Sequence, residues 1–127
     1  MAGVARYHKI TQDPEVLVGL TAGVEQLIRE CYSEKHKSFY LTSCTCLRGR
    51  PPPEVSATTF LGSFAIAYES QLTGNREHRR ILRESLTSTI AAARKEIAEG
   101  KWDGWSGAHS LCFRFTTYAL AALENKE

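Results

Sequence analysis

The sequence predicts an all-α protein folded as a compact bundle of four to five helices. Apolar residues recur at helical spacing in three long segments, and these segments begin or end at residues that favour helix termini. The composition agrees, because 43% hydrophobic and 24% charged residues are ordinary for a globular domain. The 127 residues suit one domain. We therefore expect residues 1–10 to be an N-terminal tail and residues 11–127 to form a single helical domain.

The first helix is expected in the segment TQDPEVLVGLTAGVEQLIREC. Asp13 can cap this helix, Pro14 suits its first position, and Glu15 interacts favourably with the helix dipole. The apolar stripe of the helix consists of Val16, Leu20, Val24, Leu27 and Cys31. Gly19 and Gly23 lie one turn apart. Because glycine costs about 1 kcal/mol in a helix, we expect another element to approach closely at these two positions.

Residues 38–47 form the ambiguous segment. Its Phe, Tyr and Thr residues favour a strand, whereas Tyr40, Cys44 and Leu47 fit one face of a helix that Ser33 could cap. A strand needs a partner, and the segment VARYHKI is the only candidate and a poor one. The sequence therefore favours a helix here, with an extended segment as the alternative. The stretch GRPPPE ends the element as an extended linker, because three prolines prevent regular hydrogen bonding.

Two further helices are expected in the middle of the chain. Ser56 and Gly74 mark the ends of the first, and Asn75 caps the second, which continues to Gly100. The apolar stripe of the first is Phe60, Phe64, Tyr68 and Leu72, and that of the second is Leu82, Leu86, Ile90, Ala93 and Ile97. An aromatic stripe of this kind is more typical of a core than of a ligand site. After the loop KWDGWSG, the segment AHSLCFRFTTYALAALE is apolar nearly all round, which predicts a central helix buried by the others.

The stretch NREHRRILRE carries the strongest concentration of positive charge. Each residue of a helix turns by 100°, so Arg76, Arg80 and Arg83 fall within an arc of roughly 60°, and Arg94 continues the same line. We call these four residues the arginine face. The guanidinium group matches phosphate bidentately, so the arginine face is the candidate site for a phosphorylated ligand or nucleic acid. The alternative is a solvated or protein-contacting face, since Arg80 has glutamates three residues before and four residues after it, the spacing of ordinary surface pairs.

Two other groups of residues are weaker candidates for a binding site. Trp102 and Trp105 could stack on a nucleobase, although tryptophans in such a loop more often close the end of a bundle. Cys44 and Cys46 could bind a metal with further ligands from His36, His109 and Cys112, but their spacing matches no zinc pattern. The cysteines are better explained as reduced, buried thiols. No metal and no cofactor are therefore expected.

No catalytic motif is found, since GWSG is not a nucleophile elbow and neither a zinc-protease motif nor a phosphate-binding glycine loop is present. A net charge of +2 is too small to drive nucleic-acid or membrane binding by itself. No apolar run approaches the ~20 residues of a membrane span, and the N-terminus does not resemble a signal peptide, so a cytoplasmic location is expected.

The sequence therefore favours a non-enzymatic binding protein, or a small subunit of an assembly, that recognises nucleic acid or a phosphorylated small ligand through the arginine face. The alternative is a structural or regulatory subunit that contacts protein and takes no anionic ligand. In either case a protein partner or a homo-oligomer is expected.

Overall fold

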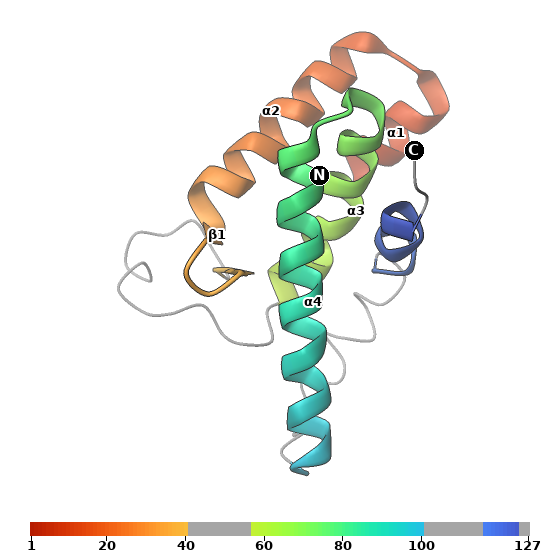
Figure 1. Cartoon of the computed structure of the whole chain (residues 1–127). Helices are drawn as coiled ribbons and strands as arrows, with labels where there is room; N and C mark the ends of the chain where they lie inside the picture. Colours follow the sequence, from red (N-terminus) through yellow and green to blue (C-terminus); the bar gives the residue numbers. More distant parts are fainter. Residues whose placement is uncertain (41–56, 101–115, 125–127) are drawn as a thin grey trace.

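The computed structural model describes residues 1–40, 57–100 and 116–124 (Figure 1). These residues are mainly helical, so the predicted all-α class is confirmed. The elements in chain order are α1 (Ala2–Thr11), α2 (Pro14–Cys31), β1 (Tyr32–Ser33), β2 (Ser38–Phe39), α3 (Ala57–Thr73) and α4 (Arg76–Ala98), and residues 116–124 are also helical. No helix in the described part of the chain is both long and apolar enough to cross a membrane.

Residues 1–10 are not a tail. They form most of α1, which packs on α2 and α3. Ala5 and His8 are buried on its inner face, and His8 Nδ1 lies 3.0 Å from the Tyr68 hydroxyl of α3. Gln12, with φ at 56°, then reverses the chain into α2. The prediction failed because α1 is held by tertiary contacts, and its N-cap residue Met1 makes no side-chain capping hydrogen bond that the sequence could reveal.

Helix α2 begins where the sequence predicts. The Asp13 side chain accepts a hydrogen bond from the Glu15 backbone N–H at 2.9 Å, and Pro14 is the first helical residue. The expected close approach at the two glycines is not found at Gly19, since a Cβ there would meet nothing within 4 Å. At Gly23 a Cβ would meet the side chain of Met1, with its Sδ at 3.0 Å and its Cγ at 3.9 Å, so the close neighbour there is a flexible side chain. An equally close contact is found at Gly62 of α3, where a Cβ would lie 3.0 Å from Leu27 Cδ2.

A short hairpin follows α2, so the preference for a helix at residue 38 and beyond is wrong for residues 38 and 39. Strands β1 and β2 are antiparallel, with Tyr32 opposite Phe39 and Ser33 opposite Ser38. The Tyr32 and Phe39 rings lie 5.2 Å apart. Ser33 does not cap a helix; its hydroxyl accepts a hydrogen bond from the His36 N–H within the turn. The strand partner is the segment directly before the turn, and a hairpin of two residue pairs is too short to show periodicity. The rest of the ambiguous segment lies outside the described residues.

Helices α3 and α4 form an antiparallel pair. Gly74, with φ at 69°, ends α3 as predicted, and the Asn75 side chain caps α4 by accepting hydrogen bonds from two N–H groups at 3.1 Å each. Glu69 contacts His78 near the turn, and Thr59 contacts Thr89 far from it. The two helices therefore run in opposite directions and stay in contact from the turn to the far end of α3.

Helix α3, and not the C-terminal segment, is the central helix. Every residue from 62 to 70 is buried, and α3 contacts α1, α2, α4 and β2. By contrast, residues 116–124 bury one face only, with Ala119 and Ala122 inside and Leu120 39% exposed. The prediction of a central C-terminal helix is therefore wrong for these residues. An apolar composition rich in alanine suits a peripheral helix as well as a buried one.

The predicted apolar stripes of α3 and α4 are buried in part, and each ends in an exposed residue. In α3 the three aromatics Phe60, Phe64 and Tyr68 are buried, whereas Leu72 is exposed. In α4 Leu82 and Leu86 are buried, whereas Ile97 is 58% exposed. For α4, Figure 1 shows the reason, since its C-terminal part extends past the other described elements.

Candidate functional site

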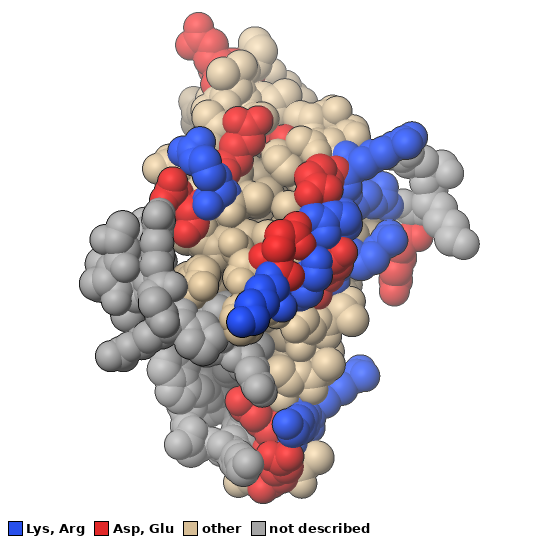
Figure 2. All heavy atoms as spheres, turned by 60° about the vertical axis from the view of Figure 1, so that its left-hand side comes forward, with Lys and Arg blue, Asp and Glu red and all other residues tan. Residues whose placement is uncertain are grey.

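The four residues of the arginine face lie on α4 but do not act as one surface. Arg76, Arg83 and Arg94 are exposed, whereas Arg80 is half-buried. In Figure 2 the lysines and arginines on this side of the molecule are interleaved with aspartates and glutamates, so no uniform positive patch is seen. The contacts of Arg80 explain much of this pattern.

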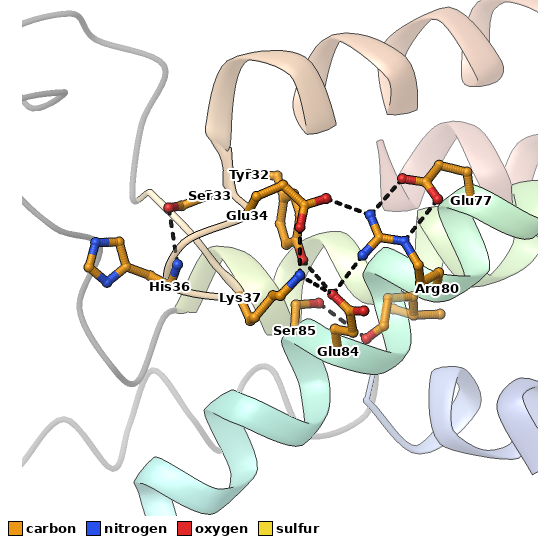
Figure 3. A network of polar contacts seen from close by, with 10 residues as sticks. Tyr32, Ser33, Glu34, His36, Lys37, Glu77, Arg80, Glu84 and Ser85 are labelled. Carbon is orange, nitrogen blue, oxygen red and sulfur yellow. Dashed lines mark hydrogen bonds and ion pairs between the residues drawn. The ribbon is translucent and has the colours of Figure 1, made fainter.

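Arg80 lies at the centre of an ionic network (Figure 3). Its Nε donates to Glu77 Oε2 at 2.8 Å, and its Nη1 donates to Glu84 Oε2 at 2.8 Å. These are the i,i+3 and i,i+4 pairs that the spacing predicts. A third carboxylate, that of Glu34 in the hairpin turn, also accepts from Arg80, although it is 46 residues away in the sequence. The guanidinium group therefore donates hydrogen bonds to three carboxylates at once.

Glu84 connects the same network to the hairpin. Its Oε2 accepts from Lys37 Nζ at 2.8 Å and from the Tyr32 hydroxyl at 3.1 Å, in addition to Arg80. The ammonium group of Lys37 and the guanidinium group of Arg80 lower the pKa of Glu84 to about 2. Burial and the hydrogen bond to Glu84 raise the pKa of Tyr32 to about 12. We call the five charged residues and Tyr32 the hairpin network: Tyr32, Glu34, Lys37, Glu77, Arg80 and Glu84.

The charge of the hairpin network weighs against a polyanion at this place. Three carboxylates, those of Glu34, Glu77 and Glu84, meet two cations, Lys37 and Arg80. One negative charge therefore remains at the middle of the predicted arginine face. A phosphate that approached Arg80 would have to displace carboxylates that already satisfy its donors. The network joins the hairpin to α4, which is a structural role.

Arg83 and Arg94 are in a different environment, at a groove between α4 and residues 116–124. The groove has a volume of about 260 Å³. Helix α4 contributes Arg83, Leu86, Thr87, Ile90, Ala91 and Arg94. The second wall contributes Leu120 and Leu123. Neither arginine pairs with a described residue, so both guanidinium groups can reach an anion.

The groove follows from the helical spacing of its residues. Positions 83, 87, 90, 91 and 94 fall on one side of a helix that turns 100° per residue. The second wall is held to α4 by Arg79, whose Nη2 donates to the backbone oxygen of Ala122 at 3.4 Å. The floor is apolar, with leucine and isoleucine side chains, and the two arginines flank it. Such a surface suits an anionic group carried on an apolar body.

A second polar group lies inside the bundle and was not anticipated from the sequence. Glu69 is fully buried, and its Oε2 lies 2.7 Å from Nδ1 of His78. Its other oxygen, Oε1, accepts from the Thr73 hydroxyl at 3.2 Å. The pair links α3 to α4 next to their connecting turn. It is explained by the packing of these two helices, because each polar atom of the carboxylate has a partner.

Of the cysteines and of the residues that the sequence suggests for metal binding or base stacking, the structure describes Cys31 and His36. Cys31 is a buried thiol, and His36 is exposed in the hairpin turn. Among the described residues no group of three or more histidines, cysteines and acids is arranged to hold a metal ion. The predicted stacking residues Trp102 and Trp105 lie outside the described residues, as do the other candidate ligands Cys44, Cys46, His109 and Cys112.

Comparison with known proteins does not extend these observations. No protein-family model matches the chain, and no curated protein or solved structure is significantly similar to it.

Proposed function

We propose that the protein is a non-enzymatic binding protein whose ligand presents an anionic group on an apolar body. The ligand binds in the groove between α4 and residues 116–124, with its charge at Arg83 or Arg94 and its apolar part on the floor. The observation that supports this proposal most directly is the groove itself, where two arginines without a described partner flank leucine and isoleucine side chains.

Nucleic acid is a weaker candidate for this ligand. A binding surface for its backbone needs several cations that release counterions together. The middle of the arginine face instead carries an excess of carboxylates around Arg80. The groove floor also offers apolar contacts, which a phosphate backbone would leave unused. These features support an amphiphilic anion over a polyanion.

The test compares octyl phosphate with 1-octanol as ligands of the protein. The two share an apolar chain and differ in charge. We expect octyl phosphate to bind, to shift the NMR signals of the Leu120 and Leu123 methyl groups, and to bind less tightly as salt is raised. The double substitution Arg83→Gln with Arg94→Gln should weaken octyl phosphate at least tenfold.

Arg76→Gln provides the control, because it removes one positive charge from the same helix at an exposed position outside the groove. This variant should bind octyl phosphate within about twofold of the parent, since a single distant surface charge is largely screened. If 1-octanol binds as tightly as octyl phosphate, or if Arg76→Gln weakens binding as much as the groove variants, the proposal is wrong. Equal binding of both ligands would instead favour an apolar protein-contacting face that takes no anionic ligand.

A further inference from the structure

We infer that the partner at the groove is an amphipathic helix of another protein that carries two acidic residues about three turns apart, with apolar residues between them. The inference rests on the proposed function and adds the class of ligand. It depends on the separation of the two groove arginines, on the size of the groove, and on the nature of its two walls.

The first observation is the separation of Arg83 and Arg94. They are eleven residues apart on α4, which corresponds to about 16 Å along the axis and to only about 20° around it. Thr87, Ile90 and Ala91 lie between them on the same side. A single small anion cannot contact both arginines over this distance. Two anionic groups, one at each end, fit the surface better.

The second observation is the size and openness of the groove. Its volume of about 260 Å³ is below the 300–1,000 Å³ that pockets for drug-sized ligands usually have. Leu120, on one wall, is 39% exposed. A groove of this kind does not enclose a small molecule, but it can accept a few apolar side chains that project from a larger partner.

The third observation is that both walls are helical. A groove between two helices is the usual receptor for a third, amphipathic helix, which inserts apolar residues at i, i+3 or i+4, and i+7. Such a helix lying along α4 has the same rise per residue. Acidic residues eleven positions apart in it would therefore reach Arg83 and Arg94 together, while the apolar residues between them contact Ile90, Leu120 and Leu123.

The probe is a synthetic alanine-based peptide of about 20 residues, long enough to be helical in water. It carries two glutamates eleven positions apart and leucines at helical spacing between them, on the same face. The matched peptide has the same composition, but its glutamates are moved to the opposite face. Because the two glutamates of each peptide are equivalent, the first peptide can bind in either direction. Binding is measured by fluorescence anisotropy of labelled peptides.

We expect the first peptide to bind the parent protein at least tenfold more tightly than the matched peptide. The double substitution Arg83→Gln with Arg94→Gln should remove this preference, whereas Arg76→Gln should retain it. Ala91→Glu, at an exposed position of the floor, should abolish binding of both peptides. Circular dichroism of each variant shows whether it retains the helical fold of the parent.

Equal binding of the two peptides, or no binding of either, would overturn the inference. If octyl phosphate still binds in a manner that depends on Arg83 and Arg94, the proposed function stands and only the helical partner is rejected. If neither octyl phosphate nor a peptide depends on these arginines, both proposals fail. A labelled single-stranded oligonucleotide serves as a third probe. If it binds more tightly than the first peptide and its binding depends on Arg83 and Arg94, the partner is nucleic acid and not a helix.

Discussion

The Tyr32 hydroxyl of β1 donates a hydrogen bond of 3.1 Å to Glu84 of α4, across 52 residues of sequence. The same carboxylate oxygen accepts from Lys37 and Arg80. One glutamate thus joins the hairpin, its turn and α4. Tyr32 loses its proton at alkaline pH, and Glu84 gains one at acid pH. Titration in each direction therefore tests these hydrogen bonds separately.

At alkaline pH Tyr32 should ionise later than an ordinary tyrosine. Its pKa in the folded protein is about 12, raised from 10.0. Because the folded pKa is the higher one, the contact stabilises the fold fully below pH 10 and this stabilisation is lost as the pH rises through 12. Ultraviolet titration of phenolate should show a transition near pH 12 that is missing in Tyr32→Phe. A Tyr32-dependent transition near pH 10, the pKa of an ordinary tyrosine, would contradict the hydrogen bond to Glu84.

At acid pH the protonation of Glu84 should lower the stability of the fold. Its pKa is about 2 in the folded protein, lowered from 4.5. Because the folded pKa is the lower one, the stabilisation is present above pH 4.5 and is lost as the pH falls through 2. Denaturant unfolding at several pH values should therefore show a shallower loss of stability in Glu84→Gln than in the parent.

Glu25→Gln is the control for this measurement, because Glu25 is exposed on α2 and lies outside the hairpin network. Its acid dependence should match that of the parent. High salt should reduce the difference between Glu84→Gln and the parent, since the ion pairs are partly exposed and therefore screened. An acid profile of Glu84→Gln that overlays the parent would show that the network does not form in solution.

Arg80 should prove to be a structural residue and not a ligand-binding one. Arg80→Gln removes the centre of the hairpin network and should lower the melting temperature, whereas its affinity for octyl phosphate should stay within about twofold, because Arg80 does not line the groove. Arg83→Gln should do the reverse, lowering affinity and leaving the melting temperature nearly unchanged. If Arg80→Gln loses as much affinity as Arg83→Gln, then Arg80 also contacts the ligand, as the arginine face predicted from the sequence requires.

The elements that the sequence predicts are those with local signals. Asp13 and Asn75 cap α2 and α4 through hydrogen bonds to residues two or three positions away, and Gly74 ends α3 through its own backbone conformation. The elements that it misses are held by distant contacts. Helix α1 is anchored by His8 on Tyr68, 60 residues away, and no pattern within ten residues reveals such a partner.

The same division applies to the candidate site. The ion pairs of Arg80 with Glu77 and Glu84 follow from spacing on one helix. The third acid, Glu34, comes from the hairpin turn, so the excess of negative charge around Arg80 appears only in three dimensions. The groove is also a tertiary feature, because it requires residues 116–124 to lie beside Arg83 and Arg94.

Two glycines should respond to substitution in opposite directions. A Cβ at Gly19 would meet nothing within 4 Å, so Gly19→Ala should stabilise the protein by about 0.5–1 kcal/mol through helix propensity. A Cβ at Gly62 would lie 3.0 Å from Leu27 Cδ2, in the packed contact of α3 with α2. Gly62→Leu should therefore cost about 1–3 kcal/mol by overpacking. Thermal unfolding measures both effects. If Gly19→Ala destabilises the protein, another group must lie close to Gly19, contrary to the structure.

The buried pair of Glu69 and His78 should behave as one unit. Each side chain satisfies the other at 2.7 Å in the interior of the α3–α4 pair. Replacing either residue alone by leucine leaves the other buried without its partner and should cost roughly 3 kcal/mol. Replacing both by leucine removes both polar groups, so the double variant should lose much less than the sum of the single variants. A cycle of denaturant unfolding on the four proteins measures the coupling, and additive losses would mean that the two side chains do not depend on each other.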